Sequence, residues 1–428
     1  MAPVVVGDGP DALRVASALA ATGATPRVLL RPTRFGPAWA RAGSGALRVA
    51  AASADRALGA LVESGPLRRG VLLGGRVRQT PLPPGGLAWF GPGAAAGVFG
   101  ARARARSAMA MAELVGGGAE ERTYADWVSR RMGTPALEGV YAGYARRRFG
   151  VGPDELGAAV ARSLHVPPEV APALARPAAG FASLEDAPAG VPVEWGVDVA
   201  GFEVVDGRVV AVIRRDGPPV PTPDGVWACV APPVVTDWLG SALPVGVHTL
   251  AAAFRAAPAA RVRAPRPALA LPDELHVLDD TARFWRVVVP AADPEALWVD
   301  FTFAPGAIVP PRGELVEAAA AGLASFGAEG GEAALAGAEV AEIEGGVPLW
   351  TPHIRARLRD VHLALRPFGV VPAGRLGAWA DLDAAEDLAL ARGLAVADAD
   401  PREVHRAQVD PPARLRDLLV SSRAFVHR

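Results

Sequence analysis

Hydrophobic and polar positions at the start of the chain predict a strand, a helix and a second strand. An apolar run at residues 4–6 precedes the turn Gly7-x-Gly9-x-x-Ala12, and a second apolar run covers residues 28–30 after an alanine-rich stretch. A glycine-rich turn between a strand and a helix is typical of a dinucleotide-binding βαβ unit. Gly7 permits the tight turn, Gly9 lets the backbone approach a pyrophosphate, and Ala12 keeps strand and helix close.

The next part of the chain predicts helices. Residues 41–75 are rich in Ala and Leu without a strong strand signal, and we expect helix and connection there. From about 98 to 165 the pattern stays helical, with Thr123 as a helix N-cap and Gly133 just past the end of that helix.

The second half of the chain changes to strand patterns. Residues 191–217 alternate apolar and polar positions around Asp206-Gly207, which predicts a β-hairpin. A fully apolar strand follows within 224–235, and apolar runs between about 248 and 303 predict an antiparallel sheet. A helix is expected over 313–326, and a short strand, a glycine turn and a long helix over 369–400.

Composition narrows the class of protein. The chain has 428 residues and a formal net charge of −1, which gives no reason to expect a nucleic-acid partner. It contains no Lys, which excludes a Schiff-base lysine and a P-loop. Cys229 is the single cysteine and the seven His are scattered, so we expect no disulfide and no metal site. No apolar run approaches the ~20 residues of a membrane span, and a cytoplasmic location is the default expectation.

Five segments follow one another along the chain: the N-terminal βαβ unit, "YAG" followed by "PDEL" within 122–156, the turn at 176–187, the hairpin and apolar strand at 205–235, and "AGRLGAW" at 373–379. In this order they resemble the flavin-dependent superfamily of monoamine oxidases, protoporphyrinogen oxidases, phytoene desaturases and UDP-galactopyranose mutase. The last segment is most similar to the C-terminal flavin-binding turn of the mutase. The resemblance implies an α/β fold with a Rossmann-like FAD/NAD(P)-binding domain, a helical insertion and an antiparallel-sheet substrate lobe.

The resemblance also implies domain boundaries. A discontinuous FAD/NAD(P)-binding domain would comprise residues 1–75, 180–245 and 355–400. The helical insertion would span 76–179 and the substrate lobe 246–354, with a C-terminal extension at 401–428 that packs on the outside.

The chain departs from the family where an adenine dinucleotide would be held. The acid that the family places at the end of the second strand, to hold the ribose hydroxyls, falls on Leu30, with Arg31 beside it. The arginine- and glycine-rich loop of the family falls on 34–38 and keeps only Arg34 and Gly36. Losing the acid removes two charge-assisted hydrogen bonds of ~1.5–3 kcal/mol each. We therefore expect FAD to be weakly held or lost, and a glutamate at position 30 or 31 to tighten its binding.

The candidate site residues follow from the resemblance. The residues expected to contact FAD are Gly7, Gly9, Ala12, Arg31, Arg34, Gly36, Gly374 and Arg375. Aromatic side chains form the candidate wall for a small-molecule substrate: Trp89, Tyr141, Tyr144, Trp285 and Trp298. Ordinary core packing is the alternative explanation for each of these aromatics, and no catalytic residue is assigned.

Three functions stay open at this point. The first is an FAD-dependent oxidoreductase of the amine oxidase or protoporphyrinogen oxidase type, which oxidises a small apolar substrate at a C–N or C–C bond. The second is a degenerate homologue, free of cofactor or weakly FAD-binding, that acts as a binding or assembly partner. The third is a mutase-like flavoenzyme on a nucleotide sugar. The sequence leaves a homodimer or heterodimer open.

Overall fold

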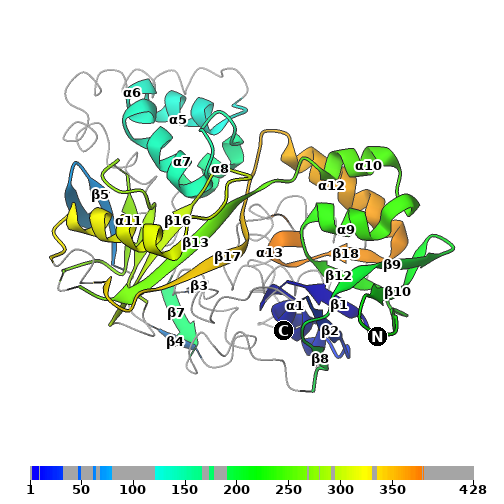
Figure 1. The fold of residues 1–428 in the computed structure, drawn as a ribbon. Helices are drawn as coiled ribbons and strands as arrows, with labels where there is room; N and C mark the ends of the chain where they lie inside the picture. The colour runs from blue at the N-terminus through cyan, green and yellow to red at the C-terminus, as the bar shows by residue number, and fades with distance from the viewer. Residues whose placement is uncertain are drawn as a thin grey trace, which may run out of the picture.

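The computed structural model describes residues 2–8, 10–31, 47–49, 61–63, 68–79, 121–165, 173–177, 190–267, 269–278, 280–290, 295–329, 335–377 and 379. These residues form an α/β structure with two lobes, each built around one main sheet (Figure 1). This is the predicted fold class.

A five-stranded parallel sheet is the centre of the lobe that contains the N-terminus. Its order is β18 (Val370–Pro372), β12 (Val226–Cys229), β1 (Val4–Gly7), β2 (Arg27–Leu30) and β8 (Val193–Glu194). Helix α1 (Pro10–Ala21) joins β1 to β2 and packs against both, which confirms the predicted βαβ unit. The strand 226–229 and the strand 370–372, distant in sequence, complete the same sheet beside β1.

A hairpin stands beside this sheet. Strands β9 (Val199–Val205) and β10 (Arg208–Arg214) pair antiparallel, and β11 (Val220–Pro221) adds a short third strand. The connecting residues Asp206 and Gly207 both have positive φ, 49° and 74°, as a two-residue type I′ turn requires. The predicted hairpin and its turn are confirmed.

A seven-stranded mixed sheet forms the second lobe. Its order is β17 (Glu339–Pro348), β13 (Ala256–Pro265), β16 (Ala296–Thr302), β15 (Arg286–Val288), β14 (Glu274–Val277), β5 (Arg69–Leu73) and β6 (Arg76–Gln79). Its pairs are antiparallel except β14 with β5, so the antiparallel sheet predicted between about 248 and 303 is confirmed. Apolar side chains on one face pack against α11 (Arg312–Ala324), close to the helix expected over 313–326.

The expectation of helix and connection over 41–75 is wrong for its described residues. β3 (Leu47–Val49) and β4 (Leu61–Glu63) flank β7 (Ala173–Pro177) in a small antiparallel sheet, and β5 belongs to the seven-stranded sheet. These strands have few β-branched residues, and their partners lie far away in sequence, so tertiary pairing overrides local propensity.

Short helices cover the other face of the seven-stranded sheet. They are α5 (Tyr124–Met132), α6 (Thr134–Ala136), the π-helix η3 (Leu137–Tyr141), α7 (Ala142–Phe149) and α8 (Ala158–His165). Thr123 caps α5 as predicted: its hydroxyl accepts from Asp126 N–H, while the Asp126 carboxylate accepts from Thr123 N–H, and Gly133 ends the helix.

One glycine lets α7 approach the sheet. Gly150 ends α7 with φ 71°, and a Cβ placed there would lie 2.0 Å from the carbonyl oxygen of Phe303, just beyond β16. No other residue fits this contact, because a side chain would collide with backbone. The sequence therefore fixes the closeness of the helical segment to the sheet at this position.

The remaining helices lie around the parallel sheet and the hairpin (Figure 1). They are α9 (Pro232–Leu239), the 3-10 helix η5 (Gly240–Ala242), α10 (Val245–Ala251), α12 (Ile354–Leu365), the 3-10 helix η7 (Arg366–Phe368) and α13 (Gly374–Gly377). The domain boundaries given above, including the extension at 401–428, stay predictions. The extension and most of the expected C-terminal helix lie outside the described residues.

Candidate functional site

The carboxyl end of the parallel sheet brings the first glycine turn against two other segments. A Cβ on Gly7 would lie 2.6 Å from the Ala12 Cβ and 2.9 Å from the Cys229 Cβ. Only glycine fits between α1 and β12, so α1 begins directly at the strand end with its positive dipole end beside the turn. Gly9, the second glycine of the motif, lies outside the described residues.

The C-terminal turn returns to this position. Gly374 has φ 68°, and a Cβ there would lie 3.0 Å from the Asp11 Cβ and 3.4 Å from the Cys229 Cβ. The backbone of α13 therefore lies beside the first turn of α1, as the predicted return of this turn to the N-terminal βαβ unit requires. The cofactor contacts assigned to Gly374 and Arg375 stay predictions. Arg34 and Gly36 lie outside the described residues.

The two residues that follow β1 and β2 form an ion pair. Arg31 Nη1 lies 2.9 Å from Asp8 Oδ1 and donates to Oδ2 at 3.1 Å. The Arg31 guanidinium also lies over the Trp238 ring of α9, 5.3 Å from its centroid. Burial raises the pKa of Asp8 to about 6, although Arg31 opposes this rise. The carboxylate therefore pays a desolvation cost that its cation only partly offsets.

A second carboxylate stands in the first turn of α1. Asp11 is paired with Arg14, one helical turn further on, and both side chains are largely buried. The helix N-terminus thus faces two carboxylates, Asp8 and Asp11, each neutralised by an arginine of this chain. An incoming diphosphate would meet two ion pairs, whose arginines are already engaged by carboxylates, beside the backbone amides that the family offers it.

The position of the ribose acid is closed. Leu30 ends β2 opposite Gly7, and its side chain has no exposed surface. The Leu30 side chain cannot accept a hydrogen bond. A polar side chain substituted at this position could reach a ligand only if the surrounding core residues repacked. Arg31, whose guanidinium has only donors, is held by Asp8 and Trp238.

These observations test whether the residues fit an adenine dinucleotide. The backbone around Gly7, Ala12 and Gly374 has the close packing that a pyrophosphate needs. The side chains of Asp8, Leu30 and Arg31 do not fit, because they supply a carboxylate to the phosphates and no acceptor to the ribose. We conclude that the described residues do not fit the dinucleotide in the manner of the family.

A second group of functional side chains lies on the seven-stranded sheet, on the face opposite α11. Four strands contribute directly opposed residues: His276 faces Arg286, Arg286 faces Asp300, and Asp300 faces Arg261. Residues opposed in neighbouring strands share one face of a sheet, so this row is continuous. Arg261, Asp300 and His276 are each at most 3% exposed. A row of polar residues that the pattern alone would place in solvent is therefore buried.

Ion pairs join this row. Asp300 accepts from Arg261 Nε at 2.6 Å and from Arg286 Nε at 2.8 Å, and Arg286 Nη1 donates to Glu274 at 3.1 Å. Burial alone would raise the pKa of Asp300, but the two arginines outweigh it and lower that pKa. Glu274 and Asp300 likewise raise the pKa of Arg286 against the opposing effect of burial. Asp300 and Arg286 are therefore both charged at neutral pH.

Tyr144 of α7 connects the helical segment to the row. Arg148 donates to the Tyr144 hydroxyl at 3.0 Å, and that hydroxyl lies 2.9 Å from His276 Nδ1. Because the Glu274 carboxylate, 3.3 Å from Nε2, can only accept, the proton of the neutral ring is on Nε2. Nδ1 then accepts from the Tyr144 hydroxyl. Burial lowers the pKa of His276 to about 4, so the ring is neutral at pH 7.

The structure gathers most of the predicted aromatic wall around this network. Arg148 and Arg286 each lie over the Trp285 ring, at 4.7 and 4.5 Å, and Arg261 lies 4.7 Å over Trp298. Trp285 is 8% and Trp298 4% exposed. Tyr141 is also buried, in the core of the helical segment, and Trp89 lies outside the described residues. The substrate role of these aromatics stays a prediction.

Sequence reasoning missed the charged members of this network. Their signal was present: polar residues recur at every second position in "ELHV" (274–277) and "RVR" (261–263), with opposite charge in neighbouring runs. Alternation of this kind usually predicts a solvated face. Only the position of α7 over the sheet shows that this face is buried.

Within the described ranges, no cluster of His, Cys, Asp and Glu could hold a metal ion. No helix in the same part of the chain is long and apolar enough to cross a membrane.

Comparison with solved structures gives the fold. The chain is similar to a reduced UDP-galactopyranose mutase (TM-score 0.65, 14% identity, 96% of this chain and 98% of that chain covered). It is also similar to a candidate protoporphyrinogen oxidase from Exiguobacterium sp. (TM-score 0.65, 14% identity, 92% and 98% covered) and to cyclohexylamine oxidase from Brevibacterium oxydans (TM-score 0.59, 14% identity, 96% and 99% covered). No protein-family model and no curated protein matches the sequence. The chain thus has the fold of FAD-dependent oxidoreductases, as the sequence resemblance predicted.

Proposed function

We propose that this chain is a binding protein built on the fold of the flavin-dependent oxidoreductases, which does not hold FAD in the manner of those enzymes. The observation that carries the proposal is the Asp8–Arg31 ion pair beside the closed Leu30 position. Of the two functions considered first from the sequence, this is the degenerate homologue that acts as a binding or assembly partner.

Three features of the described residues support it. The carboxylate of Asp8 stands at the helix N-terminus, where a pyrophosphate would bring further negative charge. Arg31 stands where an acceptor for ribose is needed, and it is already paired with Asp8. On the sheet of the second lobe, the polar side chains of the described network bind one another.

The second candidate is an FAD-dependent oxidoreductase acting on a small apolar substrate at a C–N or C–C bond. A specific observation favours it: Gly7 and Gly374 keep the backbone contacts of the two turns. In that case the flavin would supply the redox chemistry. Tyr144, Trp285 and Trp298 would form part of the wall that orients the substrate.

The experiment that separates the two candidates is the visible spectrum of protein purified under mild conditions, followed by titration with FAD. We expect protein without flavin absorption and a Kd for FAD weaker than about 100 µM at pH 7.5. Co-purified flavin, or a Kd in the low micromolar range, would overturn the proposal in favour of the oxidoreductase. A cooperative thermal unfolding transition in the same sample shows that absence of binding does not reflect unfolded protein.

A further inference from the structure

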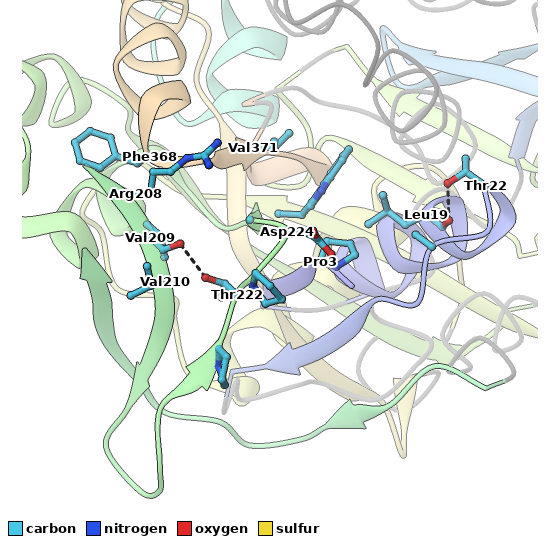
Figure 2. A pocket seen from close by; sticks show the side chains of 16 residues that line it. Pro3, Leu19, Thr22, Arg208, Val209, Val210, Thr222, Asp224, Phe368 and Val371 are labelled. Atoms are coloured by element: carbon cyan, nitrogen blue, oxygen red, sulfur yellow. Dashed lines mark hydrogen bonds between the residues drawn. The ribbon is translucent and has the colours of Figure 1, made fainter. Parts of the chain in front are cut away.

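A cavity of about 710 Å³ opens at the amino end of the parallel sheet, opposite the edge that carries the glycine turns. Residues just before three strands line it: Pro3 before β1, Gly225 before β12 and Gly369 before β18. The end of α1 and the hairpin strand β10 form its other walls (Figure 2). Its volume is in the range of cavities that take small molecules.

The walls of the cavity are mainly apolar. Trp227 and Val371 are directly opposed in β12 and β18, so they form one continuous surface. Leu19 of α1, Val209 of β10 and Phe368 of η7 face the cavity from the other elements. A ligand with an apolar body would remove this surface, and its own, from water.

Most polar groups of the cavity already have partners. The Thr222 hydroxyl donates to the Val209 carbonyl at 3.0 Å, and the Asp224 carboxylate accepts from Ala2 N–H at 2.5 Å. Thr22 donates to the Leu19 carbonyl at 2.7 Å. The hydroxyl groups of Thr222 and Thr22 and the carboxylate of Asp224 are therefore already hydrogen-bonded within the protein.

Two donors are different. Arg208, an exposed residue of β10, reaches toward Val371 in Figure 2, and within the described residues no hydrogen bond or ion pair engages its guanidinium. Trp227 is 7% exposed, and its indole N–H has no hydrogen-bond partner in the same part of the chain. The guanidinium of Arg208 and the indole N–H of Trp227 therefore remain available to a ligand, while the other polar groups named above are hydrogen-bonded within the protein.

The hairpin holds Arg208 in this position. The residue follows the Asp206-Gly207 turn directly and pairs with Val205 across the hairpin. β10 is also bonded to β11, whose continuation 222–225 lines the cavity floor. The register of the hairpin thus fixes which side of β10 carries the cation.

We propose that this cavity binds a small carboxylate with an apolar body, such as a medium-chain or aromatic acid. Arg208 would pair with the carboxylate, Trp227 N–H would donate to the ligand, and the apolar walls would cover its body. An anionic ligand fits better than a cationic one, because the Asp224 carboxylate already accepts from Ala2 N–H, while no described group engages the guanidinium of Arg208. The site is separate from the glycine turns, so the proposal does not depend on whether FAD binds.

The test is isothermal titration of the full chain with octanoate, octanol and octylamine as probes. We expect octanoate to bind with a Kd below about 1 mM, and octanol and octylamine to bind at least about tenfold more weakly. Arg208→Met should weaken the binding of octanoate to the level of octanol binding, and the affinity for octanol itself should stay unchanged. That unchanged octanol binding shows that the variant keeps its cavity.

Two further variants locate the site. Val210 is a half-exposed residue of β10 that lines the cavity. Val210→Trp fills part of the cavity and should weaken the binding of octanoate and of octanol alike. Arg215→Met is the matched control, because Arg215 pairs with Asp198 outside the cavity and should leave all three probes unchanged. No binding of octanoate up to about 1 mM would overturn the proposal. Octylamine binding as tight as octanoate, or octanoate binding insensitive to Arg208→Met or Val210→Trp, would overturn it as well.

Discussion

The guanidinium of Arg31 lies 2.9 Å from the carboxylate of Asp8, so the residues that follow two neighbouring parallel strands neutralise each other. In the flavin-dependent superfamily, the corresponding end of the second strand carries an acid that holds ribose. Here the arginine at that edge is engaged by a carboxylate of the glycine turn, and the leucine before it is buried. This arrangement motivates the first two predictions.

Replacing the Asp8–Arg31 ion pair by a single carboxylate at position 31 should create affinity for FAD. Asp8→Ala combined with Arg31→Glu removes the carboxylate from the turn and supplies an acceptor for the ribose hydroxyls. We expect the double variant to bind FAD about tenfold or more tightly than the unmodified chain. Titration followed by flavin fluorescence measures it.

The single variants sharpen this result. Arg31→Glu alone places two carboxylates together and should gain little, and Arg215→Glu, with the same charge change far away, should gain nothing. Leu30→Glu, which the sequence suggested as an equivalent change, should instead destabilise the fold, because it buries a charge. A double variant no better than the unmodified chain would show that other residues prevent binding.

Ionisation of Asp8 should lower the free energy of unfolding. Its pKa is raised from 3.8 to about 6, so the folded state binds the proton more tightly than the unfolded state, and stability falls as pH rises from about 4 to 6. Asp8→Asn should therefore raise the free energy of unfolding by about 1–3 kcal/mol at pH 8. The gain should shrink as the pH falls through 6 toward 4. Urea unfolding across this range, with the exposed Asp216→Asn as control, measures it; destabilisation at pH 8 would show that the attraction of Arg31 dominates.

His276 should make the fold sensitive to acid. Its pKa is lowered from 6.5 to about 4, so the unfolded state binds the proton more tightly between these values. The stability contributed by neutral His276 is complete above pH 6.5 and is lost, by about 2–3 kcal/mol, as pH falls to 4. His276→Gln, which keeps hydrogen-bonding groups for Tyr144 and Glu274, should cost stability at pH 7 and flatten the decline below 6.5. Chemical denaturation of both proteins between pH 4 and 7 measures this. If the free energy of unfolding depended on pH in the same way in both proteins, His276 would not be the source of the acid sensitivity.

Asp300 should be the most sensitive member of the buried network. Asp300→Asn removes the charge that two buried arginines share and should lower the free energy of unfolding by about 3–5 kcal/mol. Asp198→Asn breaks the exposed pair with Arg215 and should cost no more than about 1 kcal/mol. Chemical denaturation of both variants gives the comparison, and similar small costs would mean that the network is not desolvated.

Gly150 should be intolerant of any side chain. Gly150→Ala adds a Cβ that would lie 2.0 Å from a carbonyl oxygen, in addition to the strain of φ 71°. We expect a loss of about 3 kcal/mol or more. Gly23→Ala has similar strain, with φ 86°, but no neighbour within 4 Å, and should cost about 1–2 kcal/mol. Thermal unfolding of the pair separates collision from strain, and equal losses would contradict the close contact of α7 with the sheet.

The sequence by itself determined the parts whose signal is local. The βαβ unit, the Asp206-Gly207 hairpin and the cap at Thr123 each depend on residues a few positions apart, and all three stand in the structure as expected. The order of the five motifs also sufficed for the fold class, because a dinucleotide-type sheet needs its distant strands to return to the first one. The departures at Leu30 and Arg31 were visible in the sequence as well.

Only the tertiary structure decided what surrounds those residues. Asp8 and Arg31 are 23 positions apart, and no spacing rule pairs them; the parallel register of β1 and β2 does. In the sequence, the alternating polar residues of four strands are typical of a solvated face. In the structure, Tyr144 and Arg148 of α7 lie against this face, and it is buried. Local pattern reports what a residue can do, whereas burial and partner depend on contacts between segments far apart in the chain.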